Sequence, residues 1–271
     1  GVHITVPGDA IKASEGVIIK TAVSVLFIIP WKDQWMIGTT DTEYSGNPNE
    51  PLADRSDVQY IIDQANRVLN PRINIDQVIG VFAGLRPLVS TDPDSPTTKL
   101  SREHVIDSPA HGFVSIAGGK YTTYRVMSED AVNEAINHMR KIVPDSTTET
   151  LAIIGAEGYS VLMNQIPRLA QKYEISEANV EHLLNRYGSL IDEVLEPAQQ
   201  DSSLLALVAT NLPYLKAEIL YAVSHEGARS IDDILSRRTR IAFESPDQGL
   251  SILDDIADLI SRHLGWNEAQ A

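Results

Sequence analysis

Short apolar runs separated by polar loops dominate the first half of the chain. The runs are rich in β-branched residues, and their length favours strands over helices. Clusters of Gly, Pro, Asp and Asn, such as YSGNPNEP and STDPDSP, lie between them and are typical of turns. The pattern predicts strands at His3–Val6, Ser24–Ile29, Trp35–Thr40, Val78–Leu85 and Gly112–Ala117.

Two segments of this half have helical instead of strand spacing. In RSDVQYIIDQANRVLNP, apolar residues recur three and four positions apart, which is typical of an amphipathic helix. Ser56 and Gln59 form a candidate capping box at its start, and Asn70 and Pro71 mark its end. A second amphipathic helix is predicted from about residue 123 to residue 142.

Beyond residue 150 the pattern changes to successive helices. One helix is predicted to start at the N-cap Ser176 and to end at Gly188, where glycine favours a left-handed residue. Another is predicted to begin with Pro213 in its first turn. The second half is therefore expected to form a helical domain.

The change of pattern predicts two domains and an α+β fold class. The stretch VPDSTTET is a candidate linker. We expect an antiparallel or mixed sheet with flanking helices over residues 1–143. An all-α domain is expected over residues 144–271.

Composition and charge narrow the classes of function. The 271 residues include 43% hydrophobic and 22% charged residues, as in soluble globular proteins. A net charge of −15 makes general nucleic-acid binding unfavourable. The absence of cysteine excludes disulfides, thiolate metal sites and cysteine nucleophiles, and it fits a reducing cytosol. No apolar run is long enough to span a membrane.

The segment SIAGGKYTTYRVM places Gly118, Gly119 and Lys120 between a predicted strand and a predicted helix. Backbone N–H groups and a cation at such a junction can bind an anion. The P-loop pattern G-x-x-x-x-G-K-[ST] fails here, because Val114 and Tyr121 occupy its discriminating positions. The alternatives are a simple glycine turn with a solvated lysine and a site for an anion or an electron-rich ring.

Three further side chains are candidates for binding or catalysis. Arg86 in FAGLRPL lies between apolar residues, so either a structural salt bridge or a bidentate contact with a ligand is expected. Arg102 in KLSREHVI favours a surface salt bridge, and His3 lies in a strand, where a structural role is more common. Asp41 begins a segment with a superficial calcium-loop pattern, but its twelfth position is Leu52 instead of glutamate.

Taken together, these motifs resemble the FAD-dependent glycerol-3-phosphate dehydrogenases. The resemblance covers nearly the whole chain and includes GVHITVP, FIIPWKDQWMIGTTDTEYSGNP, FAGLRPL, SREH, AGGKYTTYRVMSEDAV, LLNRYGS, AEILYAVSHEGA and LSRRTRIAFE. The family begins with a strand–G-x-G-x-x-G–helix unit that binds the FAD pyrophosphate, and this sequence contains no such unit. We therefore expect the C-terminal portion of such an enzyme, which alone would be inactive and would not hold FAD tightly.

The resemblance implies a redox reaction of a phosphate ester. FAD would accept a hydride from C2 of sn-glycerol 3-phosphate, giving dihydroxyacetone phosphate, and the electrons would pass to a quinone. It further implies a cytoplasmic protein, with peripheral attachment at the inner face of the cell membrane and homodimerisation of the full enzyme as open questions. Nucleic acid and metal are not expected partners.

The resemblance implies that the domain of residues 1–143 binds substrate and contacts the flavin, and the matched motifs imply roles for four of its residues on the substrate side. Arg86 and Lys120 would lie at the substrate end of the flavin, where both would bind substrate and take part in catalysis. Arg102 would help to bind the phosphate. His3 would polarise or deprotonate the C2 hydroxyl, since that hydroxyl must lose a proton.

The motifs also imply the cofactor contacts. Gly118, Gly119, Lys120 and Thr122 would approach the flavin ring, with the start of the following helix directed at the electron-rich edge of the ring. Two alternatives remain open. The isolated chain could be a non-catalytic binding or assembly module, or part of an oxidase of the same family that uses oxygen.

Overall fold

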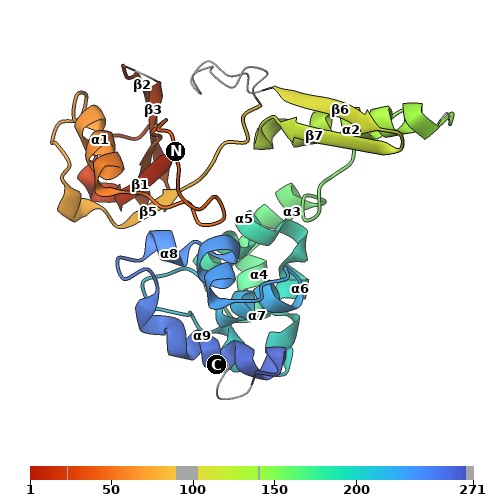
Figure 1. Cartoon of the computed structure of the whole chain (residues 1–271). Helices are drawn as coiled ribbons and strands as arrows, with labels where there is room; N and C mark the ends of the chain where they lie inside the picture. The colour runs from red at the N-terminus through yellow and green to blue at the C-terminus, as the bar shows by residue number, and fades with distance from the viewer. Residues whose placement is uncertain (23, 90–102, 140, 267–271) are drawn as a thin grey trace. The chain divides into compact units, whose positions relative to one another are not determined.

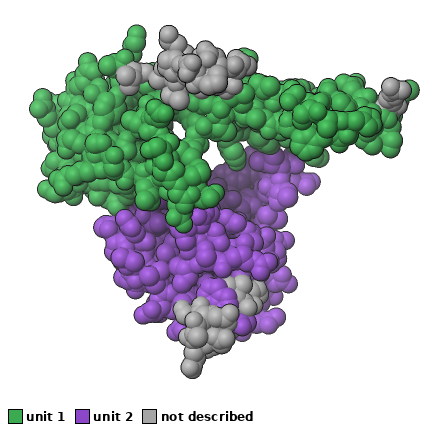
Figure 2. All heavy atoms as spheres, viewed as in Figure 1, with its two compact units in different colours: residues 1–151 green, residues 152–271 purple. Residues whose placement is uncertain are grey.

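The computed structural model describes residues 1–22, 24–89, 103–139 and 141–266. The chain divides into two compact units, unit 1 (Gly1–Leu151) and unit 2 (Ala152–Ala271), which Figure 2 shows in green and purple. The boundary expected from the linker, between residues 143 and 144, lies within unit 1.

Unit 1 is built on a five-stranded sheet with the order β2-β3-β4-β1-β5 (Figure 1). Every neighbouring pair in this sheet is antiparallel. A separate antiparallel pair, β6 and β7, follows it. The strands are β1 (Val2–Pro7), β2 (Val17–Lys20), β3 (Val25–Trp31), β4 (Gln34–Gly38), β5 (Gly80–Ala83), β6 (His104–Ala110) and β7 (Phe113–Gly118).

One face of the five-stranded sheet carries the core of unit 1. Alternate residues of β1, namely Val2, Ile4 and Val6, are buried on this face. Helix α1 (Arg55–Ala65) packs on it with an apolar stripe that includes Ile61. Burial of a side chain such as Ile61 contributes about 1.5–3 kcal/mol, so the stripe fixes the helix on the sheet.

The start of α1 differs from the sequence prediction. Asp54, not Ser56, is the N-cap, and its carboxylate accepts a hydrogen bond from the Asp57 N–H at 2.9 Å. The Asp57 carboxylate in turn accepts from the Asp54 N–H at 3.3 Å. Ser56 instead donates to the Asp54 carboxylate, so the capping box predicted from Ser56 and Gln59 is wrong.

The β6–β7 hairpin leads through a short 3-10 helix (Tyr121–Thr123) to helix α2 (Tyr124–Met139), which packs against both strands. The helix starts and ends within the predicted range of residues 123–142. Nε2 of His104 on β6 lies within hydrogen-bond distance, 2.9 Å, of the Asp130 carboxylate on α2, and Ser108 donates to Glu134 at 3.2 Å. These polar contacts join the hairpin to the helix.

Unit 2 consists of short helices around two apolar clusters. Its helices are α3 (Tyr159–Met163), α4 (Ile166–Tyr173), α5 (Glu177–Tyr187), α6 (Ile191–Leu195), α7 (Lys216–Ser224), a π-helix (Asp233–Arg238), α8 (Ile241–Glu244) and α9 (Leu253–Leu264). Within the described ranges, no helix is both long and apolar enough to span a membrane.

The ends of α5 agree with the sequence pattern. Ser176 caps its start by accepting the Asn179 N–H at 3.1 Å, and Gly188 follows its end with φ of 57°. The prediction for Pro213 is wrong, because α7 starts only at Lys216, after an extended segment that pairs Leu207 with Leu215. Antiparallel sheets followed by a helical unit confirm the expected α+β fold class.

Candidate functional site

The order of the strands brings three chain segments to one edge of the five-stranded sheet. Because β1 runs antiparallel to both β4 and β5, the start of β1 lies beside the ends of its two neighbours. His3 lies at the start of β1, Asp41 follows β4 and Arg86 follows β5. Residues that are far apart in the sequence therefore meet at this edge.

The His3 ring is mostly enclosed between the neighbouring strands. It stacks on Phe82 of β5 with ring centroids 5.0 Å apart and an angle of 5° between the planes. On the other side it occupies the space where a Cβ atom of Gly38 on β4 would lie. Burial, followed by the charges of the Gly1 amine and Arg86, lowers the pKa of His3 to about 4. The imidazole is therefore neutral at pH 7.

Arg86 is held by an ion pair with Asp41, whose Oδ2 lies 3.3 Å from Nη1 of the arginine. The Asp41 side chain is 14% exposed, whereas that of Arg86 is 32% exposed. The salt bridge that the sequence left as one alternative for Arg86 is therefore present. It engages one nitrogen of a guanidinium group that carries five donors, so it leaves the ligand-binding role open.

Gly118 ends β7, and Gly119 begins the turn that leads to the 3-10 helix before α2. Their φ angles are 77° and 79°, a conformation that side chains other than glycine rarely adopt. A Cβ atom on Gly118 would lie 2.8 Å from the carbonyl oxygen of Glu103, so glycine is needed there for packing as well. Lys120 follows in extended conformation, and its carbonyl accepts from the Thr123 N–H at 3.0 Å.

A cavity of about 460 Å³ joins Arg86 to this glycine turn. Two cations, Arg86 and Lys120, and two tyrosine side chains, Tyr121 and Tyr124, lie along it. The full lining is Leu85, Arg86, Pro87, Leu88, Gly118, Gly119, Lys120, Tyr121, Tyr124 and Met127. An open cavity with two cations and a glycine backbone that carries no side chains can hold an anionic group next to a planar ring.

The structure brings together some of the residues predicted from the sequence. Arg86, Lys120, Gly118 and Gly119 line this one cavity, whereas His3 and Thr122 are not among its lining residues. Arg102 lies outside the described residues. The contact between Asp41 and Arg86 was not predicted from the sequence. The available signal was the position of Asp41, shortly after a strand that pairs with β1.

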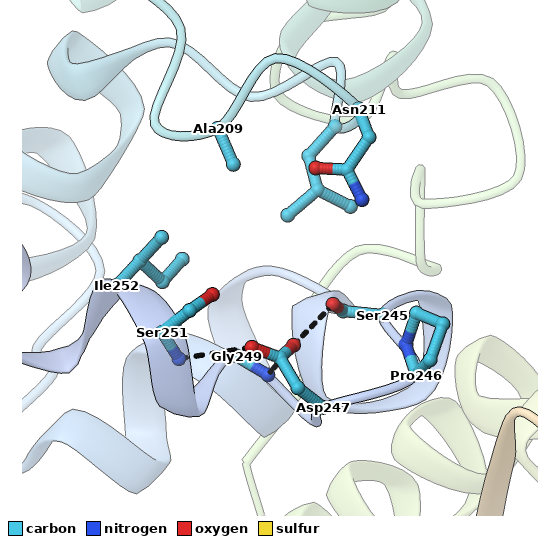
Figure 3. Close-up of a pocket in the computed structure, with 9 residues that line it drawn as sticks. Ala209, Asn211, Ser245, Pro246, Asp247, Gly249, Ser251 and Ile252 are labelled. Carbon is cyan, nitrogen blue, oxygen red and sulfur yellow. Dashed lines mark hydrogen bonds between the residues drawn. The ribbon is translucent and has the colours of Figure 1, made fainter.

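A smaller cavity of about 200 Å³ lies in unit 2 between the 209–212 segment and the turn at residues 245–252 (Figure 3). Its carboxylate, Asp247, accepts hydrogen bonds from the Ser245 hydroxyl and from the N–H groups of Gly249 and Ser251. These bonds hold the pKa of Asp247 well below its usual range. The carboxylate stabilises the turn, so the cavity offers no charged group that needs a ligand.

Comparison with known families agrees with the arrangement of unit 1. Residues 1–125 match the family model described as FAD dependent oxidoreductase. Residues 146–271 match the model for the C-terminal domain of alpha-glycerophosphate oxidase. The chain therefore has the two-part organisation of a class of flavin-dependent oxidoreductases.

Curated relatives define the family more closely. Glycerol-3-phosphate dehydrogenase 2 of Mycobacterium tuberculosis (strain ATCC 25618 / H37Rv) is 44% identical over 269 residues, covering 99% of this chain and 46% of the relative. The glycerol-3-phosphate dehydrogenase of Mycobacterium leprae is 43% identical over 98% of this chain and 45% of the relative. The human mitochondrial glycerol-3-phosphate dehydrogenase is 32% identical over 99% of this chain and 37% of the relative.

A solved structure supports the same assignment. The glycerol-3-phosphate dehydrogenase from Bacillus halodurans complexed with FAD matches with a TM-score of 0.83 and 25% identity, covering 99% of this chain and 53% of that one. This chain spans about half the length of the relatives it matches. The chain belongs to the FAD-dependent glycerol-3-phosphate dehydrogenase family.

Proposed function

We propose that this chain carries the substrate-binding and flavin-facing part of an enzyme that oxidises sn-glycerol 3-phosphate to dihydroxyacetone phosphate. The observation that carries the proposal is the cavity of unit 1, in which Arg86 and Lys120 lie beside the Gly118–Gly119 turn. Two cations beside a glycine backbone suit a phosphate ester next to a flavin ring.

The residues of the cavity fit FAD as the cofactor. The turn at Gly118 and Gly119 has no side chains, so a planar ring can approach its backbone closely. Lys120 would place a positive charge at the ring, and Thr122, which is exposed at the start of the next helix, would contact its edge. When bound, FAD supplies the hydride acceptor. Residues 1–271 contain no G-x-G-x-x-G unit, so we propose that they do not hold FAD tightly by themselves.

The cations and His3 would make different contacts with the substrate. Arg86 can direct two parallel N–H donors at a phosphate or at the oxygen on C2, whereas Lys120 offers a point charge. We assign Arg102 to the phosphate on the resemblance alone. The neutral His3 imidazole can accept a hydrogen bond from the C2 hydroxyl, which loses its proton as the hydride leaves.

The proposal has two versions, which differ in the final electron acceptor. We favour a quinone, with a cytoplasmic enzyme that attaches to the inner face of the cell membrane and forms homodimers. The alternative is an oxidase that passes electrons to oxygen. Formation of hydrogen peroxide during turnover with glycerol 3-phosphate would identify the oxidase, whereas reduction of a soluble quinone without peroxide would support the dehydrogenase.

The test is reduction of an artificial dye by glycerol 3-phosphate, in a flavin-loaded protein that joins this chain to a dinucleotide-binding region. Arg86→Ala and Lys120→Ala should each lower kcat/KM about tenfold or more, because a charge-assisted hydrogen bond contributes roughly 1.5–3 kcal/mol. Arg72→Ala and Lys12→Ala remove exposed cations of the same unit and serve as controls.

The outcomes separate the functional classes. Normal kinetics in both the Arg86 and the Lys120 variants would refute the assignment of the site. A flavin-loaded protein that does not oxidise glycerol 3-phosphate would refute the substrate and favour the non-catalytic alternative, a binding or assembly module. A yellow protein with about one flavin per chain, purified from residues 1–271 alone, would refute the proposal that tight FAD binding needs further sequence.

A further inference from the structure

We propose that Asp41 is a positioning residue of the candidate site, which orients the Arg86 guanidinium toward the substrate. The inference rests on the proposed function, because it assigns Asp41 a role in the same cavity. Asp41 is not itself among the lining residues of that cavity, so it would act through Arg86 and not by contact with the substrate.

The ion pair has the geometry that this role requires. Oδ2 of Asp41 lies 3.3 Å from Nη1 of Arg86, and the carboxylate is the less exposed of the two groups. The guanidinium is planar and carries its donors on several edges, so a carboxylate on one edge fixes the direction of the others. Arg86 itself lines the cavity, where its remaining donors are available to a ligand.

The backbone around Asp41 is held firmly enough to position another side chain. The preceding residue, Thr40, is 1% exposed. Its Oγ1 accepts the Val2 N–H at 3.0 Å, and its own N–H donates to the Val2 carbonyl at 3.3 Å. The following residue, Thr42, donates to Asp57 of α1 at 3.2 Å. Strand β1 and helix α1 therefore hold the residues on both sides of Asp41.

The pair would improve binding through preorganisation. A free arginine side chain loses much rotamer freedom when it is fixed on a ligand, and an existing ion pair removes most of that cost before the substrate arrives. The carboxylate also offsets part of the positive charge of Arg86. The second effect opposes anion binding, so a positioning role predicts that loss of Asp41 weakens turnover even though the site becomes more positive.

A double-mutant cycle on kcat/KM in the flavin-loaded enzyme tests the inference. The single variants are Asp41→Ala, Asp41→Asn and Arg86→Ala, and each Asp41 change is repeated in the Arg86→Ala background. With Arg86 present, Asp41→Ala should lower kcat/KM about tenfold. With Arg86 absent, the same change should alter it less than twofold, because the group that Asp41 orients is missing.

Asp41→Asn and two further variants, Asp41→Glu and Glu15→Gln, separate a positioning role from a folding defect. Asp41→Asn keeps the shape of the side chain and should reduce kcat/KM less than Asp41→Ala, while Asp41→Glu should restore most of the loss. Glu15→Gln removes an exposed negative charge from the same unit and should have no effect on kcat/KM. Flavin absorbance and the thermal midpoint of each variant report on folding.

The failures of the two proposals are distinguishable. If Arg86→Ala retains normal kinetics, the proposed site is wrong and the inference falls with it. If Arg86→Ala is impaired but the Asp41 changes cost the same factor in both backgrounds, Asp41 does not act through Arg86. Normal kcat/KM in Asp41→Ala, or higher kcat/KM from the gain in positive charge, would also overturn the positioning role.

Discussion

The lowered pKa of His3 predicts how the stability of the protein depends on pH. In the unfolded chain this histidine should titrate near its ordinary pKa of 6.5, whereas in the folded unit its pKa is about 4. Burial is the largest cause, and the charges of the Gly1 amine and Arg86 add to it. The enclosed position between Phe82 and the backbone of Gly38 explains the burial.

The sign of the effect follows from which state binds the proton. Above pH 6.5 His3 is neutral in both states and contributes nothing to the pH dependence of stability. Between pH 6.5 and 4 the unfolded chain binds a proton that the folded unit does not, so the free energy of unfolding decreases as the pH falls. In this range each pH unit lowers the free energy of unfolding by up to about 1.4 kcal/mol. Because the ring is partly exposed, solvent screening reduces this loss, and we expect a total loss of about 1–2 kcal/mol at pH 5.

The measurement combines NMR with chemical unfolding of the whole chain. The His3 ring signals, assigned with His3→Gln, should titrate near pH 4 in the folded protein. Between pH 7 and 5 the natural chain should lose about 1–2 kcal/mol more of its unfolding free energy than His3→Gln does. His111→Gln removes an exposed histidine of the same unit and should not reproduce this difference.

A folded-state titration of His3 near pH 6.5 would refute the reasoning. Such a result would mean that the ring is hydrated and not enclosed by its neighbours. It would also change the proposed role, because a histidine of pKa about 4 is a weak base that is already neutral at pH 7. An acid limb in the pH profile of kcat/KM that belongs to His3 is expected below about pH 5, and His3→Gln should remove it.

Two further predictions concern the stability of unit 2. Glu218 is fully buried, and its Oε2 lies 3.5 Å from Nε of the partly buried Arg186. Glu218→Gln removes the charge opposite Arg186 and should lower the free energy of unfolding in urea by about 1.5–3 kcal/mol, whereas the exposed Glu181→Gln should change it little. Gly188→Ala should lower the free energy of unfolding by at least about 2 kcal/mol, because the new Cβ would collide with the backbone carbonyl of Gly155. Gly158→Ala should lower it by about 1 kcal/mol, because φ is 71° there but the space around the new Cβ is open. Equal losses within either pair would contradict the corresponding argument.

The sequence predicts most elements of the fold because their patterns are local. Alternation of buried Val2, Ile4 and Val6 identifies β1, and helical spacing identifies α1. The start of α1 was misplaced because Asp54 and Ser56 are both good N-cap residues, and only the geometry of the chain decides between them. Strand β6 was not predicted at His104–Ala110, because its second half contains Asp, Ser and Pro, which favour turns.

Only those parts of the candidate site could be predicted from the sequence whose residues are neighbours in the chain. Gly118, Gly119 and Lys120 stand next to one another, so the sequence alone names an anion site there as one alternative, beside a simple glycine turn. The pairing of Arg86 with Asp41 depends on the strand order β4-β1-β5, which no local pattern contains. A salt bridge and a ligand contact were separate alternatives for Arg86 in the sequence, but the five donors of a guanidinium allow both at once.

The two cations of the cavity are placed in different ways, and this difference indicates different contributions. Arg86 is tied to Asp41 on a rigid segment, so part of its charge is offset and its direction is fixed. No ion pair joins Lys120 to another residue in the part of the chain that the structure describes, and its side chain is exposed, so its full charge is available to an anion. In the proposed site, Arg86 would therefore mainly direct the anion and Lys120 would mainly attract it. In the role proposed for it, the neutral His3 would accept a hydrogen bond from a substrate hydroxyl without adding a third positive charge.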